Sequence, residues 1–349
     1  MPPPDAAPRG DDASVDVLVV RGERVDPIDG WGGEDVIDAV VAVLRTAGVR
    51  AATASVGTPR DVGELVAPRL ITMPNSRRFG DAHGEQHSLP ALLERRGLPY
   101  VGSSAEGHAA RSKSHMKLVL EDHGIATPRW TLVEDPGRVD TAALRFPAVV
   151  KPEGASESLG VVRIADAREL EAKLRALALA DSLPALVEEW ALQREFTVAV
   201  VGNGPERRGF PMQVRFPAGE SFLTEDVKRH RLLHTPITVA DEPVRRHLEE
   251  LAVETTEAFG ILDMARIDIL EDATGRLAVI DVNTFPGLRQ TSEHISYFPF
   301  CLRFGLGLDY AQSILAIVAA ALRRYGLELP PAIRAVSDRL LGADPAPDR

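Results

Sequence analysis

Two apolar segments in the last third of the chain, 265–270 and 277–287, carry polar side chains that could bind a metal ion and phosphate. These side chains are Arg266, Asp268, Asp281 and Asn283. Alternate residues of a strand share a face, and the turn formers of 271–275 predict a hairpin that brings both pairs together. Mg²⁺ prefers carboxylate and phosphate oxygens, and arginine offers a forked donor to phosphate or a developing oxyanion. An edge hairpin with a solvated polar face is the alternative.

A loop rich in Gly and Ser, 151–160, offers a second set of groups for phosphate. Lys151 follows the apolar run 146–150 and would place a point charge at the end of a strand. Backbone N–H groups and hydroxyls of such a loop can surround a polyphosphate. The spacing is not that of a P-loop, which needs GxxxxGK followed by Ser or Thr. The alternative is a hairpin loop with an exposed lysine.

Two glutamates and a charged segment complete the candidate groups. Glu188 and Glu195 lie at strand ends, where carboxylates can accept hydrogen bonds from a ribose or from an adenine amino group. The segment 222–231 is dense in charge, which is typical of a loop that closes over phosphates. Surface glutamates and a solvated loop are the alternatives.

The elements that would position these residues form three regions. Over about 13–105, strand and helix patterns alternate as β-α-β-α-β, which predicts an open α/β layer. Its elements are expected at 15–20, 35–47, 70–73, 89–95 and 100–101. A small middle region follows, with helices at 112–122 and 167–179 and strands at 147–151, 160–164, 185–189 and 196–201. The last region holds a helix at 244–259, the hairpin and a helix at 310–325.

These patterns divide the chain into three domains and two tails. The tails are 1–12, which we expect to be disordered, and 341–349. The domains are an N-terminal α/β substrate domain at 13–111, a central domain at 112–200 and a C-terminal domain with the metal site at 201–340.

Composition excludes several classes of function. Of the 349 residues, 40 are Lys or Arg and 51 are Asp or Glu, so the formal net charge is 40 − 51 = −11. This charge argues against a nucleic-acid coat and against a polybasic membrane anchor. The start of the chain does not read as a signal peptide, and no apolar stretch is long enough to span a membrane. The single cysteine, Cys301, lies among apolar residues and reads as a buried thiol rather than a nucleophile. We expect a cytoplasmic protein.

The order of the blocks resembles the ATP-grasp superfamily, and within it the D-alanine–D-alanine ligase-like carboxylate–amine ligases. The resemblance covers about residues 95–320. It rests on Gly97–Ser103, Ser112–Lys113 with Lys117 and Gly124, Val150–Pro152 with Ser158 and Gly160, Val187–Glu188, Glu195–Val198, Arg266–Asp268 and Asn283–Gly287. It implies an α/β protein of three domains, α+β in the ATP-grasp part, that joins a carboxylate to an amine through an acylphosphate.

The resemblance also implies roles for residues that match the family's motifs. Lysines would bind the phosphates of ATP, and these are Lys113, Lys151 and Lys228. Adenine would lie against Glu188 and the backbone near Glu189 and Trp190, while Glu195 would accept the ribose hydroxyls. Two Mg²⁺ ions, with Mn²⁺ as the alternative metal, would be held by Asp268, Asp281 and Asn283. The family usually has Glu where this chain has Asp281.

The remaining implied roles concern the reacting groups. Arg266 and the N–H of Gly287 would form the oxyanion hole. Ser158 lies where a loop serine of the family meets substrate. Ser292 lies near the serine that binds the carboxylate of the second amino acid, although the segment after Gly287 is longer here. The small-molecule substrates would be amino-acid-like, and family members are often dimers, which predicts a homodimer.

The N-terminal part departs from the family pattern. The family's Gly-rich loop after the first strand carries a Glu for the amine of the first substrate, and Glu23 or Asp26 could serve here. In the family's next loop Glu85 aligns, whereas the expected histidine falls on Gly80. His83 or His87 could replace that histidine, or could be surface residues.

These departures predict a ligase with an altered substrate pocket, in a specialised pathway. The alternatives are a true D-alanine–D-alanine ligase of cell-wall synthesis, a non-catalytic ATP-binding protein on the same fold, and other ATP-grasp chemistry such as acyl transfer to a carrier or ring closure.

Overall fold

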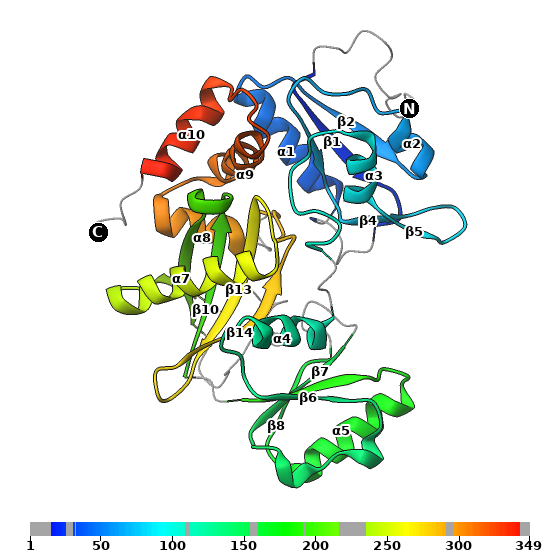
Figure 1. Ribbon diagram of the computed structural model, residues 1–349, viewed down its shortest axis with the longest axis vertical. Coiled ribbons are helices and arrows are strands. Elements are labelled where there is room, and N and C mark those ends of the chain that lie inside the picture. The colour runs from blue at the N-terminus through cyan, green and yellow to red at the C-terminus, as the bar shows by residue number, and fades with distance from the viewer. Residues whose placement is uncertain are drawn as a thin grey trace.

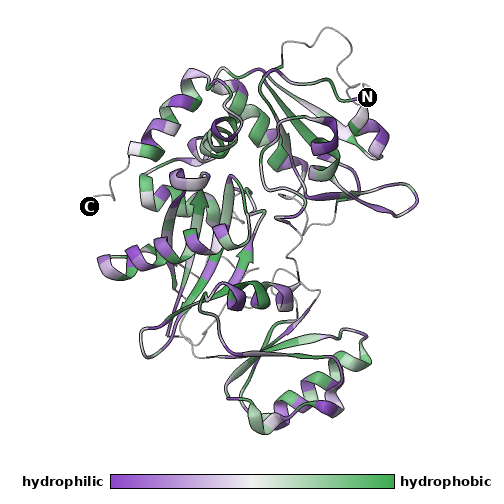
Figure 2. Cartoon of the chain, viewed as in Figure 1, coloured by the Kyte–Doolittle hydropathy of each residue, from purple (hydrophilic) through white to green (hydrophobic). Residues whose placement is uncertain are grey.

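Three larger sheets with their helices follow one another along the length of the computed structural model, and a two-stranded sheet adjoins the first of them (Figure 1). The structure describes residues 15–25, 31, 33–108, 112–153, 160–190, 193–215, 235–290 and 296–342. Hydrophobic residues follow the strands, while the helices that cover the sheets mix hydrophobic and hydrophilic residues (Figure 2). This mixture is what a helix needs when one face packs on a sheet and the other meets water.

The N-terminal sheet is parallel, with strand order β2-β1-β3. Its strands are β1 (Val17–Gly22), β2 (Ala51–Val56) and β3 (Ile71–Pro74). The helices are α1 (Glu34–Thr46), α2 (Pro59–Gly63) and α3 (Leu89–Arg96), and a hairpin of β4 (Arg78–Gly80) and β5 (Gln86–Ser88) precedes α3. The connection from β1 leads to β2 on one side of it, and the next strand, β3, lies on its other side, so the strand order switches between β1 and β3. Ligands of such sheets bind at the carboxyl ends of the strands that flank this switch point.

Several elements of this region differ from expectation. The sequence analysis did not predict β2, α2 or the β4–β5 hairpin. The strand expected at 100–101 is a single bridge between Thr72 and Tyr100.

The central sheet is antiparallel, with order β6-β9-β7-β8. Its strands are β6 (Trp130–Val133), β7 (Ala148–Pro152), β8 (Val162–Ile164) and β9 (Ala185–Glu189). Helix α5 (Ala167–Leu179) buries Leu170, Leu174 and Leu177 against it. Helix α4 (Lys113–Asp122) lies between this sheet and the next (Figure 1), and the Ser112 hydroxyl accepts the His115 N–H as its N-cap. Two 3₁₀ helices, Pro136–Arg138 and Thr141–Ala143, follow β6.

The C-terminal sheet is antiparallel, with order β12-β11-β10-β13-β14. Its strands are β10 (Arg194–Val201), β11 (Arg208–Arg215), β12 (Thr235–Thr238), β13 (Met264–Glu271) and β14 (Leu277–Asn283). Its helices are α7 (Glu242–Ala258), α8 (Tyr297–Leu306), α9 (Tyr310–Arg324) and α10 (Pro331–Gly342), and the 3₁₀ helix Gly204–Glu206 joins β10 to β11. Strand β10 belongs to this sheet, whereas the sequence analysis placed it in the central domain ending at 200.

Helices α7 and α9 pack on opposite faces of the C-terminal sheet and belong to different cores. The core on the α9 side also contains Val17 and Val40 from β1 and α1, so the N-terminal and C-terminal regions share it. No single helix among the described residues is long and apolar enough to cross a membrane; α8 and α9 reach that length and composition only as a pair bent by 95°.

A buried carboxylate fixes the N-terminal sheet to α9. Asp263 is fully buried, and its Oδ2 accepts hydrogen bonds from the N–H of Gly102 at 2.7 Å and from Arg324 Nη2 at 2.7 Å. Asn203 donates to the other oxygen at 2.8 Å. These charge-assisted contacts hold the start of β13 at a set position relative to the N-terminal region.

Candidate active site

The predicted hairpin is present as β13 and β14, and its register brings the four polar side chains together. Arg266 pairs with Asn283 across the strands, and Asp268 pairs with Asp281. Directly opposed residues of an antiparallel pair lie on the same face, so these four side chains share one side of the sheet. A bulge follows Asp268. We call this group the hairpin cluster.

Arg266 donates two hydrogen bonds to the carboxylate of Asp268. Its Nε lies 3.1 Å from Asp268 Oδ1 and its Nη2 lies 2.9 Å from Oδ2. Thr197 on the neighbouring strand β10 donates its hydroxyl to Oδ1 at 2.7 Å. Burial would lower the pKa of Arg266, but the carboxylates of Asp268 and Asp281 raise it above its usual value. The guanidinium is therefore a fixed cation, and the sequence analysis had missed Thr197.

The other two members of the hairpin cluster offer oxygens to the site. Asp281 is exposed, and the Asn283 side-chain oxygen accepts the N–H of Phe285 at 3.0 Å. The donor set of two carboxylates and an amide is the hard-oxygen chemistry that Mg²⁺ selects. Asp268 Oδ2 accepts one hydrogen bond from Arg266, which leaves a lone pair for a metal. The residues present therefore fit the metal that the resemblance implies.

A buried carboxylate between two ammonium groups forms the second cluster. Glu188 on β9 is 1% exposed, and it makes ion pairs with Lys117 on α4 through Oε1 and with Lys151 on β7 through Oε2. Burial would raise the pKa of Glu188, but the two lysines hold it below its usual value. Glu188 in turn raises the pKa of Lys151 against the effect of burial. Burial lowers the pKa of Lys117, while the charge of Glu188 acts in the opposite direction. We call these three residues the lysine–glutamate triad.

Lys113 lies beside the triad. Its ammonium donates to the backbone oxygens of Pro152 at 2.8 Å and Glu153 at 3.2 Å, where the loop after β7 begins. Burial lowers the pKa of Lys113, while the charge of Asp281 acts in the opposite direction. The charge of Asp281 also acts on Lys117 and Lys151. The hairpin cluster and the lysines are therefore within electrostatic reach of one another, as a site for metal and phosphate requires.

The segment expected to hold adenine differs in part from the expectation. The N–H of Glu189 donates to Arg129 O and the N–H of Trp190 donates to Pro147 O, both at 2.9 Å. These two donors are therefore not available to a base. Glu195 on β10 is 5% exposed and is not a solvated surface residue.

An aromatic and polar group that the sequence analysis missed lies between the hairpin cluster and the N-terminal sheet. Trp31 stacks on Phe285 with ring centroids 5.5 Å apart, and His108 packs edge-on against the same ring. His108 Nδ1 lies 2.9 Å from the hydroxyl of Thr284, to which Arg77 also donates at 3.4 Å. Since Thr284 and Phe285 directly follow β14, this group forms a wall of the site.

The carboxyl ends of β1 and β3 meet at Asn75. Its side-chain oxygen accepts the N–H of Gly22 at 3.0 Å, and its backbone oxygen accepts the N–H of Trp31 at 3.0 Å. The neighbouring Ser76 hydroxyl is fully buried and has no hydrogen-bond partner in the part of the chain that the structure describes. Asn75, Ser76 and Arg77 directly follow β3, and Arg77 connects this segment to Thr284 beside the hairpin cluster.

Two predicted substrate residues lie elsewhere. The Glu23 carboxylate lies against Gly57 at the end of β2, on the side of β1 away from β3. Glu85 is exposed on the β4–β5 hairpin. Neither residue has a described contact with the hairpin cluster, and their roles toward the first substrate stay predictions.

The predicted histidine positions are also on the β4–β5 hairpin. Gly80 ends β4, His83 is exposed, and His87 pairs with Asp81 at 3.0 Å. Asp81, Glu85 and His87 could together offer ligands to a metal. However, the Asp81 carboxylate already accepts the N–H groups of His83 and Glu85 as well as His87 Nε2. Asp81 therefore holds the loop closed.

Four candidates lie outside the described residues, namely Asp26, Ser158, Lys228 and Ser292. Cys301 is described, fully buried and hydrogen-bonded to Thr197 O at 3.6 Å, and burial raises its pKa to about 12. The prediction that the Cys301 thiol is buried is confirmed, and its lack of reactivity stays a prediction.

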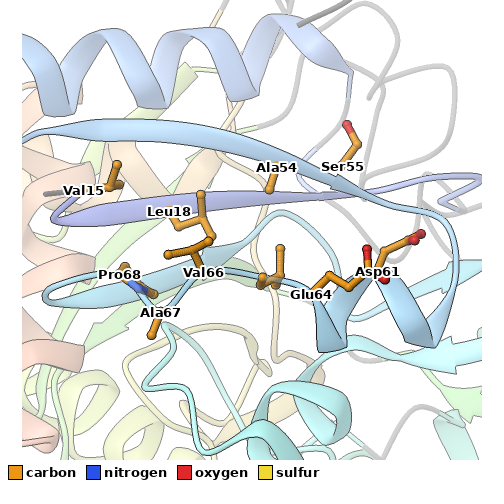
Figure 3. A pocket seen from close by; sticks show the side chains of 10 residues that line it. Val15, Leu18, Ala54, Ser55, Asp61, Glu64, Val66, Ala67 and Pro68 are labelled. Atoms are coloured by element: carbon orange, nitrogen blue, oxygen red, sulfur yellow. The ribbon is translucent and has the colours of Figure 1, made fainter. Parts of the chain in front are cut away.

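A cavity of about 150 Å³ lies away from these clusters (Figure 3). It is lined by Val15, by the strand residues Leu18, Ala54 and Ser55, by Asp61, and by the segment from Glu64 to Pro68. None of the predicted site residues lines it, and its only described charged groups, Asp61 and Glu64, are already bonded to Gly57 and Arg60. The cavity therefore belongs to the packing of α2.

Comparison with known proteins identifies the family. The family model described as "D-ala D-ala ligase C-terminus" matches residues 119–319. A D-alanine–D-alanine ligase of Pseudomonas fluorescens is 32% identical over 81% of this chain and 85% of its own length. The chain belongs to the D-alanine–D-alanine ligase family. Members of this family are ATP-dependent, peptide-bond-forming ligases with the ATP-grasp fold.

Other relatives agree with this assignment. The ligase of Ectopseudomonas mendocina is 33% identical over 83% of this chain and 90% of its own. The crystal structure of the Bacillus anthracis D-alanine–D-alanine ligase with ATP superposes with a TM-score of 0.67, at 21% identity, over 90% of this chain and 99% of that one. The predicted α/β ATP-grasp fold is thereby confirmed.

Proposed function

We propose that this ligase joins two amino-acid-like substrates through an acylphosphate, with a first-substrate pocket that differs from that of its D-alanine-specific relatives. The main support for this chemistry is that two sets of side chains that a nucleoside triphosphate needs lie within electrostatic reach of each other. The hairpin cluster would supply oxygens for a metal, and Lys113 and Lys151 would supply charge for the phosphates.

The first step would be attack of a substrate carboxylate oxygen on the γ-phosphorus of ATP, which breaks the bond to the β-phosphate and releases ADP. Lys113 and Lys151, beside the start of the loop after β7, would bind the phosphates and hold them in line. Asp268, Asp281 and Asn283 would hold two Mg²⁺, which offset the negative charge on the phosphate oxygens.

The second step would be attack of an amine on the acyl carbon, followed by loss of phosphate. Arg266 uses Nε and Nη2 to hold Asp268, so its remaining N–H groups can point to the oxyanion of the tetrahedral intermediate. The N–H of Gly287 donates to none of the described residues and would be the second donor. Such preorganised donors need no rearrangement as the charge develops.

The altered pocket rests on the carboxyl ends of β1 and β3. Glu23, the candidate for the amine of the first substrate, turns toward β2. Among the described residues, those that contact Thr284 and Phe285 from this end are Arg77, Trp31 and His108. A guanidinium and a buried hydroxyl suit a carboxylate or another acceptor better than an ammonium group. This supports a first substrate other than D-alanine, of the kind that a specialised pathway would use.

A true D-alanine–D-alanine ligase is the second candidate, because the curated relatives at 32–33% identity carry that name. A homodimer and a cytoplasmic location remain predictions from the resemblance and the composition.

The test is ADP release by the purified protein with Mg·ATP and D- or L-amino acids, singly and in pairs, with products identified by mass spectrometry. We expect D-alanine alone to be a poor substrate and another pair to give one peptide for each ADP. Rapid formation of D-alanyl-D-alanine from D-alanine alone would refute the altered pocket and establish the second candidate.

A further inference from the structure

Lys117 is a buried ammonium group for which the proposed chemistry has no use. It is 0% exposed, lies one helical turn after Lys113 on α4, and pairs with Glu188 Oε1. An unpaired charge at such a position would be strongly destabilising. Lys117 therefore depends on its ion pair with Glu188.

Lys117 is also connected to the C-terminal sheet. Its ammonium donates to the Thr127 hydroxyl at 2.6 Å, and that hydroxyl donates to Val279 O on β14 at 2.8 Å. The N–H of Val279 returns a hydrogen bond to Ala126 O at 2.8 Å. Lys117 thus links α4, the central sheet through Glu188 and the C-terminal sheet through Thr127.

Lys151 holds the same carboxylate but is placed differently. It lies on β7, one residue before Pro152, its side chain is 14% exposed, and its ammonium faces Glu188 Oε2. A phosphate that binds at this strand end would compete with Glu188 for Lys151, because both are anions that seek the same cation. Lys117 has no such exposure, so it would remain with Glu188.

We infer that Lys117 is a positioning residue of the nucleotide site: it is the permanent counterion that keeps Glu188 ionised and in place when Lys151 turns to the phosphates of ATP. This inference rests on the proposed function in taking ATP as the ligand. Without Lys117, Lys151 is the one cation among the described residues that still makes an ion pair with Glu188, and binding ATP must then leave a buried carboxylate without that partner. Removing one partner of a buried pair is costly, whereas removing both is often neutral.

The test is calorimetric titration of Mg·ATP, without amino acids, into the wild type, Lys117→Met, Glu188→Gln and the double variant Lys117→Met/Glu188→Gln. We expect Lys117→Met to weaken binding roughly 100-fold. The double variant should recover at least about tenfold of that loss, because the neutral amide that replaces the carboxylate needs no cation and leaves Lys151 available to the phosphates. Lys173→Met on α5 removes the same charge outside the site and should bind as the wild type does.

Two results would overturn the inference. One is a Lys117→Met protein that binds ATP as the wild type does, and the other is a double variant that binds no better than Lys117→Met. A purely bracing role for Lys117 predicts the second result. If Lys117→Met does not fold, the double variant is compared with Glu188→Gln: agreement within about threefold supports the inference, and a further tenfold loss overturns it.

The same titration, together with the ADP-release assay, separates this inference from the proposed function. A wild type that binds ATP but ligates no substrate would contradict the ligase proposal and leave the comparison of variants intact. A wild type that does not bind ATP would overturn both.

Discussion

Replacing Thr197 with valine tests how the strand beside the hairpin prepares Asp268 for a metal. Thr197 is 2% exposed and lies opposite Asp268 across β10 and β13. Its hydroxyl donates to Oδ1 at 2.7 Å, while Arg266 holds both oxygens from the other side. Valine keeps the shape of the side chain and deletes this one donor. The carboxylate would then be held by Arg266 alone.

The magnitude follows from the hydrogen bond that is lost. A hydrogen bond to a charged group contributes about 1.5–3 kcal/mol, and about 1.4 kcal/mol corresponds to a factor of ten in affinity. We therefore expect the affinity of the Thr197→Val protein for Mg²⁺ to fall by roughly 10- to 100-fold, which is the usual effect of removing a partner that orients a metal ligand.

The assay is ADP release at saturating ATP with the substrate pair that the wild type uses, as a function of free Mg²⁺. Thr197→Ser is the matched control: it keeps the hydroxyl and loses a buried methyl group, so its thermal stability should fall by about 1 kcal/mol while its Mg²⁺ dependence stays close to the wild type. A folded Thr197→Val protein with the Mg²⁺ dependence of the wild type would refute the reasoning.

Three further predictions concern other parts of the molecule. Arg266→Ala should lower turnover by roughly 10²- to 10³-fold through loss of an oxyanion donor; a loss of less than tenfold in a folded protein would leave Arg266 only its role of holding Asp268. Cys301 is buried and its pKa is raised to about 12, so the native protein should not react with a thiol reagent at pH 8 but should react once unfolded; reaction of the native protein would contradict its burial. The hydrogen bond from His87 lowers the pKa of Asp81 to about 2 from 3.8, so this contact stabilises the loop above about pH 4 and is lost as the pH falls toward 2. A carboxyl NMR titration should show that low midpoint, and His87→Ala should return it toward 3.8; an unchanged midpoint in His87→Ala would exclude His87 as the cause.

The sequence predicted the hairpin cluster well because its signals are local. Alternation of apolar and polar residues fixes which side chains share a face, and the short turn between the strands leaves little choice of register. The structure accordingly pairs Arg266 with Asn283 and Asp268 with Asp281. The helix over Ala167–Leu179 was predicted to the residue, because Asp166 caps its start and its apolar positions recur with helical spacing.

The partners of these residues come from distant elements, and no local pattern reports them. The pairing of Glu188 with Lys117 joins residues that are 71 positions apart, and that of Thr197 with Asp268 spans the same separation. Reading Glu188 as an adenine ligand therefore overlooked its two counterions, Lys117 and Lys151. The turn of Glu23 toward β2 was likewise out of reach, since β2, with the sequence AATASV, has too few large apolar residues to stand out as a strand.

Some elements were missed although a signal was present. Helix α10 buries Ile333, Val336 and Leu340, which recur with helical spacing. Helix α8 has Pro299 in its first turn, where proline is tolerated, and its apolar residues surround the helix rather than forming one stripe.

The central claim is that a substrate carboxylate becomes an acylphosphate, and the fate of one oxygen atom tests it most directly. The enzyme is given Mg·ATP, an amine substrate and a carboxylate substrate labelled with ¹⁸O, and the released inorganic phosphate is analysed by mass spectrometry. Because the carboxylate oxygen that attacks the γ-phosphorus leaves with it, we predict one ¹⁸O atom in each phosphate and one fewer in the peptide. Phosphate free of ¹⁸O would mean that water attacks ATP, and would contradict the account.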